Sequence, residues 1–440
     1  MAKLKNGLRL IPAGVWGVSV ANLLVSVSTS MMFSISPFYL TEVLGLSVLS
    51  VGFIEGFAEM LSQLCKLGSG VSGDFFKRKK PTLMVGFLLA TISKPIFILA
   101  GGPGLVVFSK LMERVSNGII ATPRDAYIAD VTSKKDRGTC FGIMMTFKTL
   151  GCTIGSWGIA GLSLWTKDYR MLLWFGFLPC LLAVYSVYQW VTEPKESQPK
   201  TPEELAKAAA KAERKKIHFK DFAQLSFKYW SLIAVAILFM CARFTDGFLG
   251  MRLKEIGMPE WVCYSTVGTF NLISAFCCLP IGWLSDRINR CTMLYFSFIT
   301  LALSNLCFIF AGDWLLAMLG VLFWGAQRGT SQILFTAIIS DEAPKKIRGT
   351  AIGLYYIGTA GAAVIAGALA GWASKDAVQG AFVFGLAASM LACLALCLRQ
   401  FLLKLRSAIH WIPAFSTIRF LSARRVNAPI GMDEAYKKAS

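Results

Sequence analysis

Charged side chains lie inside long apolar stretches of this chain, where each costs roughly 2.5–3.5 kcal/mol on entering a bilayer. Glu55 and Glu59 are four residues apart and therefore share one face of a helix. Neighbouring carboxylates disfavour joint ionisation, so one of these two is a candidate proton carrier. The other charges in such stretches are mostly basic and predict a positive cavity that favours an anion: Lys94, Arg114, Lys148, Arg243, Asp246 and Arg328.

The elements that must position these charges are long apolar helices. Hydrophobic residues make up 55% of the 440 positions and charged residues only 16%, against about a quarter in a soluble chain. The apolar runs predict an all-α membrane protein with twelve transmembrane helices of about 20 residues each. The expected spans are 15–39, 48–70, 82–102, 106–129, 139–164, 170–192, 229–251, 261–284, 291–311, 314–340, 349–373 and 377–402.

The net charge of +20 is distributed as in a membrane protein. Basic residues gather in the loops after even-numbered spans, so these loops and both termini are expected in the cytoplasm. A basic face with interleaved aromatic residues is absent, which argues against a nucleic-acid partner. The expected organisation is a six-helix bundle (1–192), a basic cytoplasmic linker (193–228), a second six-helix bundle (229–402) and a basic cytoplasmic tail (403–440).

Neither a cofactor nor a metal is expected. Nearly all of the twelve cysteines lie in apolar runs, without a Cys-x-x-Cys pair, and the two histidines, His218 and His410, fall in the linker and the tail. The chain also lacks a Gly-x-Ser-x-Gly elbow and a nucleotide-binding glycine loop. We therefore expect no enzymatic activity, and any transport must use an ion gradient or the gradient of the solute itself.

The two halves of the chain carry the same loop pattern. Segment 70–78 recurs as 282–290, with glycine, aspartate and arginine at matching positions and an offset of 212. Segment 130–138 recurs as 341–349, with an aspartate seven residues before an Arg-Gly pair and an offset of 211. Several motifs in order at a nearly constant offset indicate duplication of a six-helix unit. Gly118 and Gly142 likewise match Gly329 and Gly353.

These loops resemble the signature between the second and third spans of major facilitator transporters, Gly-x-x-x-Asp-Arg/Lys-x-Gly-Arg-Arg/Lys. The match from Gly282 to Arg290 has Asn289 at the inner glycine, and in the first copy Phe75 stands at the first basic position. The resemblance implies a cytoplasmic latch that breaks as the halves rock, although these residues could instead only cap helices and set topology. The expected latch residues are Asp74, Arg78, Asp130, Arg137, Asp286, Arg287, Arg290, Asp341 and Arg348.

Two narrower resemblances concern single spans. The run from Pro123 to Asp130 is similar to a Pro-Arg-Asp-Ala-Leu-Ile-Ala-Asp run in a bacterial subgroup of the family, with Tyr127 in place of the leucine. This resemblance implies the bacterial inner membrane. The glycines around Gly155 resemble the fifth-span motif of drug–proton antiporters, with Ser156 at the proline position. Close helix packing explains these glycines equally well.

Comparison of the halves separates charges that the fold needs from charges that it does not. Glu55, Glu59 and Lys148 match Val267, Asn271 and Thr359 in the second copy, which does without the charge. We therefore expect these three residues to serve function. Arg243 and Asp246 lie three residues apart and form either part of the pathway or a neutralising structural pair.

The leading hypothesis is a secondary active transporter that moves a small polar anion: an organic acid, a phosphorylated metabolite or a carboxylate siderophore. Proton coupling is expected from Glu55 and Glu59, uptake is slightly favoured, and the protein is expected to be a monomer in the bilayer. The alternative is a drug–proton antiporter. A non-transporting receptor on the same scaffold is a third hypothesis.

Overall fold

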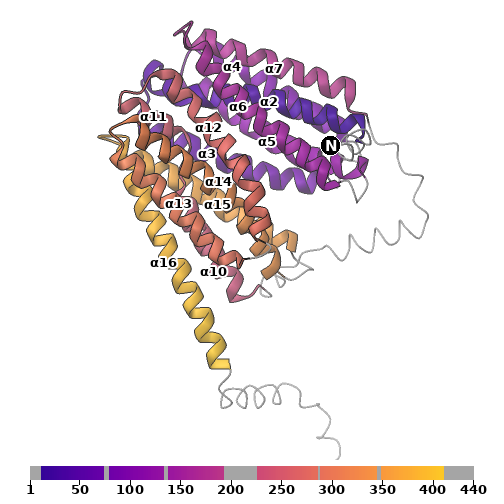
Figure 1. The fold of residues 1–440 in the computed structure, drawn as a ribbon. Coiled ribbons are helices and arrows are strands. Elements are labelled where there is room, and N and C mark those ends of the chain that lie inside the picture. Colours follow the sequence, from indigo (N-terminus) through magenta and orange to yellow (C-terminus); the bar gives the residue numbers. More distant parts are fainter. Residues whose placement is uncertain are drawn as a thin grey trace, which may run out of the picture. The chain divides into compact units, whose positions relative to one another are not determined.

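The computed structural model is all-helical and describes residues 11–73, 79–132, 137–192, 225–285, 288–343 and 348–410. In Figure 1, α2, α4, α6 and α7 lie side by side in the first half of the chain, in agreement with the contacts of α2 with α6 and α7. The helices of this half are α2 (Ala13–Phe38) with the π-helical turn η1 (Tyr39–Val43), α3 (Val48–Gly73), α4 (Lys79–Leu99), α5 (Pro103–Val131), α6 (Arg137–Leu162) and α7 (Tyr169–Trp190).

The second half repeats this order with one interruption. Its helices are α10 (Phe227–Ala242), α11 (Gly247–Glu255), α12 (Glu260–Ser285), α13 (Arg290–Phe310), α14 (Trp314–Glu342), α15 (Arg348–Ala373) and α16 (Gln379–His410). The single span expected at 229–251 is therefore two helices, because the chain leaves helical geometry between Arg243 and Asp246. With α2 and η1 counted together, and α10 and α11 counted together, the described residues form twelve long helices.

By contacts, the chain divides into Met1–Cys393 and Leu394–Ser440. The second unit holds the last part of α16, which is helical to His410, and its Leu394 and Leu398 are exposed. The expected linker at 193–228 lies outside the described residues up to 224, and the expected tail does so after 410.

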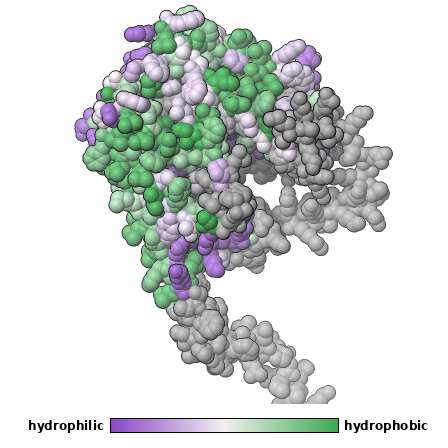
Figure 2. Space-filling model, viewed as in Figure 1, coloured by the Kyte–Doolittle hydropathy of each residue, from purple (hydrophilic) through white to green (hydrophobic). Residues whose placement is uncertain are grey.

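Nine helical stretches among the described residues are long and apolar enough to cross a membrane. Two of them each combine two elements: Ala13–Val43 comprises α2 and η1, and Phe227–Glu255 comprises α10 and α11. The other three long helices are α5, α6 and α14. Large hydrophobic side chains are exposed on many helices, and Figure 2 shows broad hydrophobic areas on one face, as expected for a surface that meets lipid.

Side chains of the first half pack into a buried core between α2, α4, α5, α6 and α7. The hydrophobic faces of these helices interlock there, which fixes their relative rotation. The core includes Val15, Val18, Val25, Leu83, Phe87, Ile128, Met144, Cys180 and Val187.

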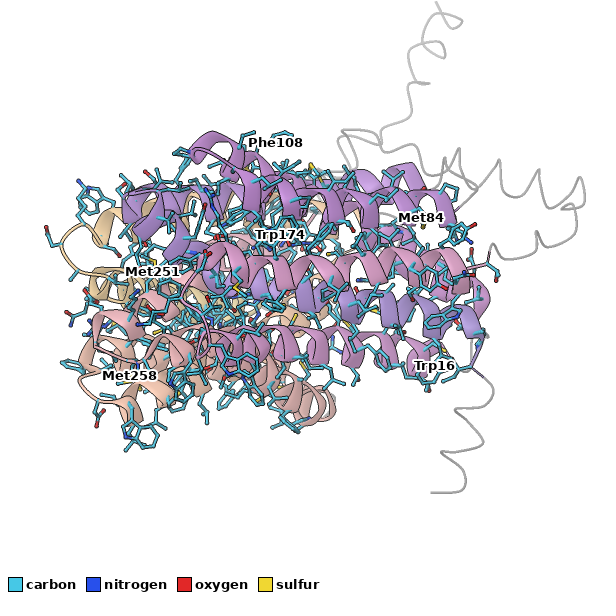
Figure 3. All side chains as sticks on the ribbon, turned by 90° about the horizontal axis from the view of Figure 1, so that it is seen from above. Trp16, Met84, Phe108, Trp174, Met251 and Met258 are labelled. Carbon is cyan, nitrogen blue, oxygen red and sulfur yellow. The ribbon has the colours of Figure 1, made fainter. Side chains whose placement is uncertain are left out.

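The helices alternate in direction, so their ends form two sets. The Glu42 end holds the last residues of η1, α6 and α11 and the first residues of α3 and α12; the Asp130 end holds the opposite termini. In Figure 3, Met258 lies at the Glu42 end, and Trp16 and Met84 lie at the Asp130 end.

Two ion pairs at the Asp130 end are related by the repeat. Lys79 pairs with Asp130, and Arg290 pairs with Asp341. The structural counterpart of Arg290 is therefore Lys79, at the offset of 211 that also relates Asp130 to Asp341, and not Arg78, its counterpart in the sequence motif. Each pair joins consecutive helices of one half, α4 with α5 and α13 with α14. Of the other expected latch residues, Arg137 and Arg348 are the first residues of α6 and α15. Asp74, Arg78, Asp286 and Arg287 lie outside the described residues.

At the Glu42 end, Arg252 of α11 closes the carboxyl end of α13. Its guanidinium donates to the carbonyl oxygens of Phe308 at 3.0 Å and of Ile309 and Ala311 at 3.4 Å each. It also binds Glu255 at 2.7 Å. A cation at a helix carboxyl terminus satisfies carbonyls that the helix itself leaves free.

Replacing Arg252 with methionine should lower the free energy of unfolding by about 1–3 kcal/mol, because buried carbonyls lose their donors. For a chain of 440 residues, each kcal/mol corresponds to a thermal midpoint lower by roughly 1 °C. Differential scanning fluorimetry of the purified protein measures this change. Lys375→Met, which removes an exposed cation at the same end, is the control and should leave the midpoint unchanged.

Candidate functional site

The break between α10 and α11 places two charges in the interior of the first unit. Arg243 is the residue that ends α10, and its backbone N–H donates to the carbonyl of Phe239 at 3.1 Å. Asp246 immediately precedes α11, but its side chain makes no capping bond to that helix. A helix interrupted within a membrane leaves backbone groups and side chains free to meet a solute or an ion.

The carboxylate of Asp246 instead binds two side chains of α14. One oxygen accepts a hydrogen bond from the indole Nε1 of Trp324 at 2.9 Å, and the other pairs with Arg328. The guanidinium of Arg328 also lies over the ring of Phe270, 5.1 Å from its centroid. The structure thus pairs Asp246 with Arg328 of a different helix rather than with its sequence neighbour Arg243.

In the first half, Arg114 of α5 lies between two carboxylates of α3. Its guanidinium nitrogens are 3.8 Å from Glu55 and 4.0 Å from Glu59, and the group stacks over Phe33 with 5.0 Å to the ring centroid. Glu59 also accepts a hydrogen bond from Gln63 at 2.9 Å. The Glu59 side chain is 39% exposed and that of Glu55 only 1%, so solvent reaches one carboxylate and not the other.

Lys110 of α5 is a site residue that sequence reasoning missed. Its ammonium pairs with Glu55 and donates to the hydroxyl of Ser36 at 2.5 Å, with both charged side chains buried. Lys110 and Arg114 are four residues apart, and this spacing places them on one face of α5 opposite the Glu55 and Glu59 face of α3. One sequence pattern could have revealed Lys110: its four-residue spacing from Arg114 equals the spacing of Glu55 from Glu59.

Lys94 lies in a separate buried pair. Its ammonium contacts Glu113, with side-chain exposures of 3% and 9%, and it approaches the sulfur of Met32 at 3.5 Å. The structure therefore brings Lys94 to α5 inside the first half, where its charge is neutralised. Glu55 is likewise enclosed in its pair with Lys110. The remaining expected pathway residues lie together in one region of the protein.

We call this region the central charge cluster, defined as Glu59, Arg114, Lys148, Arg243, Asp246 and Arg328. Electrostatic interactions cross between the halves within it. Glu59 is attracted by Arg328 and Arg243 of the second half, and Arg114 is attracted by Asp246. The six groups are partly open to solvent, with 29% exposure for Arg328 and 20% for Arg114. Lys148 is exposed and the other five residues are half-buried, so water can reach the cluster.

Two cations of the cluster have no direct partner. Among the residues that the structure describes, neither Lys148 nor Arg243 makes an ion pair or a side-chain hydrogen bond. Lys148 is repelled by Arg124, Lys66 and Arg328, whereas Arg243 is repelled by Arg328 and attracted by Asp246 and Glu59 without a direct contact. Since Glu59 matches Arg114 and Asp246 matches Arg328, Lys148 and Arg243 leave the cluster with two positive charges in excess. One of them comes from each half.

The arrangement offers anion binding rather than metal chemistry. Over the described part of the chain, no three His, Cys, Asp or Glu side chains come close enough to hold a metal ion. The free groups of the cluster are an ammonium and a guanidinium, which bind carboxylate and phosphate oxygens.

The pairing of Lys110 with Glu55 predicts a strong coupling between the two residues. Lys110→Met should lower the free energy of unfolding by about 3–5 kcal/mol, because it leaves a carboxylate buried without its main partner. The double variant Glu55→Gln, Lys110→Met should cost less than Lys110→Met alone. Thermal midpoints of the three purified proteins measure the coupling, and equal midpoints for the single and double variants would contradict the pairing.

Comparisons with known proteins agree on the family. The family model of the Major Facilitator Superfamily matches residues 18–278 and 249–426. An uncharacterized MFS-type transporter of Methanocaldococcus jannaschii is 26% identical over 389 residues, which cover 86% of this chain and 92% of that protein. The multidrug resistance protein MdtH of Photorhabdus laumondii is 26% identical over 155 residues, 35% of this chain and 38% of that one.

Solved structures share the fold at low sequence identity. A POT peptide transporter in complex with sulfate superposes with a TM-score of 0.70 at 14% identity, covering 89% of this chain and 94% of its own. The nucleoside transporter NupG gives 0.68 at 15% identity, covering 88% and 99%. A D-xylose-proton symporter gives 0.66 at 16% identity, covering 87% and 96%. From the family model, the relatives and the fold together, this chain belongs to the major facilitator superfamily of membrane transporters.

Proposed function

We propose that the protein is a secondary active transporter, not an enzyme, that moves a small polar anion by alternating access with proton coupling. The solute is an organic acid, a phosphorylated metabolite or a carboxylate siderophore, and uptake is the direction that we favour. The observation that carries the proposal is the pair of unmatched cations, Lys148 on α6 and Arg243 at the end of α10.

An anion bound between these two cations would offset the electrostatic repulsion among the cations of the empty cluster. Lys148 and Arg243 belong to different halves, and both repel Arg328 when the site is empty. A bound anion would attract both halves, so it favours a state in which they approach around the solute. A ligand shifts a conformational equilibrium only through such a difference in affinity between states.

The membrane arrangement forms part of the same proposal. All twelve helices cross the bacterial inner membrane as two pseudo-symmetric six-helix bundles, with both termini in the cytoplasm and the Glu42 end outside. The equivalent pairs Lys79–Asp130 and Arg290–Asp341 support the pseudo-symmetry. The resemblance of the Pro123–Asp130 run to the motif of a bacterial subgroup supports this localisation. The protein acts as a monomer, with the lipid bilayer and the solute as its partners.

Glu59 is the better of the two candidate proton carriers. Glu55 is enclosed with Lys110, whereas Glu59 is partly exposed and its nearest cation stands 4.0 Å away. Protonation of Glu59 would neutralise one of the two carboxylates beside Arg114 and raise the excess positive charge of the cluster from two to three. Proton binding would therefore strengthen binding of the anion, which is the sign required for symport.

A thermal-shift screen on the purified protein tests the substrate class. Dicarboxylates, tricarboxylates or phosphate monoesters should raise the midpoint, because a ligand that binds the folded state stabilises it. Lys148→Gln and Arg243→Gln should each weaken binding by about 10–100-fold, the loss of one charged hydrogen-bond donor. Lys375→Gln serves as the matched surface control. Stabilisation by lipophilic cations alone would overturn the proposal.

Proteoliposomes with an imposed pH gradient test the coupling, with a solute that the screen identifies. Glu59→Gln should retain exchange of the solute down its own gradient and lose accumulation driven by protons. Glu55→Gln should not show this separation, because its partner is the enclosed Lys110. Full gradient-driven accumulation by Glu59→Gln would rule out this carboxylate as the carrier.

Export of drugs by proton antiport is the second candidate. It is favoured by the partial match to MdtH and by the glycines around Gly155 that resemble the antiporter motif. The excess of positive charge in the cluster opposes it for any drug that is itself a cation, since like charges repel. The same ligand screen separates the two functions.

A further inference from the structure

Ser156 of α6 makes an unusual contact with α12 at the Glu42 end. Its hydroxyl donates to the backbone carbonyl of Tyr264 at 2.6 Å and accepts from the backbone N–H of Gly268 at 2.8 Å. These two backbone groups are four residues apart, so they are the natural hydrogen-bond partners of one another within an α-helix. A side chain from one half of the protein therefore binds both members of a backbone pair in the other half.

The hydroxyl of Ser156 is fully buried, and its hydrogen-bonding capacity is fully satisfied. Ser34 of α2 donates to it at 3.2 Å, which gives Ser156 one donated and two accepted bonds. A hydroxyl that enters the backbone ladder of another helix needs unusually close packing. Gly268 permits this, because a Cβ there would lie 2.9 Å from the Cβ of Ser156 and 3.0 Å from the carbonyl oxygen of Thr153.

The repeat provides an internal comparison. At offsets of 212 and 211, Tyr264 and Gly268 match Gly52 and Gly56 of α3, and Ser156 matches Gly367 of α15. The helices α3 and α15 also pack closely at this end, where a Cβ on Gly52 would lie 2.2 Å from the carbonyl oxygen of Gly367. The sister interface closes without a hydroxyl, so closure of the fold unit does not itself require Ser156.

Among the described residues, the other hydrogen bonds and ion pairs that join the halves gather at the same end, including a buried bond that the hydroxyl of Thr153 donates to the carbonyl of Gly268 at 3.4 Å. Lys254 of α11 pairs with Glu42 at 2.6 Å, and Trp157 donates to Thr269 at 3.2 Å. Lys254 and Glu42 are about one third exposed, and such pairs contribute little because water competes for both partners. The buried bonds of Ser156 are therefore the more effective polar link in this interface.

We propose that Ser156 is a hydrogen-bond exchange switch of the Glu42 end. With this end closed, the hydroxyl binds the Tyr264 carbonyl and the Gly268 N–H. With it open, α6 withdraws, the two backbone groups bind only each other, and water solvates the hydroxyl. Every polar group keeps a partner in both states, so opening leaves no buried donor or acceptor unsatisfied. Such an unsatisfied group would raise the free energy of the open state and thereby favour the closed interface.

This inference rests on the alternating motion in the proposed function but not on the identity of the solute or on proton coupling. It also assigns a role to the serine that occupies the proline position of the antiporter-like motif. Proline has no hydroxyl with which to make this exchange, so the departure from that motif is the feature that creates the switch.

Hydrogen–deuterium exchange of the purified protein in lipid nanodiscs tests the switch without a ligand. Ser156→Ala keeps the Cβ and removes the hydroxyl, while α12 can still form its own bond. The open population should rise about fivefold, the effect of one net hydrogen bond. Exchange should become faster in segments 150–162 and 260–272 at the Glu42 end. It should become slower in 120–132 and 334–343 at the Asp130 end, which closes as the other opens.

Two further variants complete the experiment. Ser163→Ala removes a hydroxyl that only donates to Ala160 of its own segment, and it should change neither end. Gly268→Ala should shift exchange in the same direction as Ser156→Ala, because its methyl group prevents close approach while Ser156 remains present. Unchanged exchange in Ser156→Ala, or faster exchange at both ends, would overturn the switch, since the second result describes local loosening. An opposite shift at the two ends supports it even if the proposed anion is wrong.

Discussion

The cost of an unmatched charge in an apolar interior governs this structure. The two buried lysines of α4 and α5 each have a carboxylate opposite them, Lys94 with Glu113 and Lys110 with Glu55. These pairs hold the first half together through α3, α4 and α5 and leave no charge for a solute. Function can only use what such pairing leaves over. In the central charge cluster, Lys148 and Arg243 are left over, and both lie where solvent reaches the interior.

The same constraint shapes the interrupted seventh span. The break between α10 and α11 brings Arg243 and Asp246 to the interior, and α14 neutralises the carboxylate through Trp324 and Arg328. Arg243 is thereby left for another partner. A continuous helix would have satisfied its own backbone but would have placed the two side chains along one helix face, where they could neutralise each other. The break thus converts a potential local pair into one tertiary pair and one available cation.

The outer interface follows a related rule for backbone groups. Close packing of α6 on α12 and of α3 on α15 requires small residues. Motion between the open and closed states also requires that no buried polar group lose its hydrogen-bond partner in either state. Ser156 meets both conditions in one interface, and bare glycine meets them in the other. At the Asp130 end, the described ion pairs connect helices within one half, so they stabilise each half and do not join the two.

The sequence by itself determined the helix content, the order of the long helices, the family and the repeat, because hydrophobic length and motif spacing are local properties of the chain. All six members of the central charge cluster were among the charged residues that the sequence singled out. Only the tertiary structure decided which charges meet. It paired Asp246 with Arg328 rather than Arg243, enclosed Glu55 with the overlooked Lys110, and split one expected span in two. Pairing depends on the rotation and separation of helices distant in sequence, which no local pattern encodes.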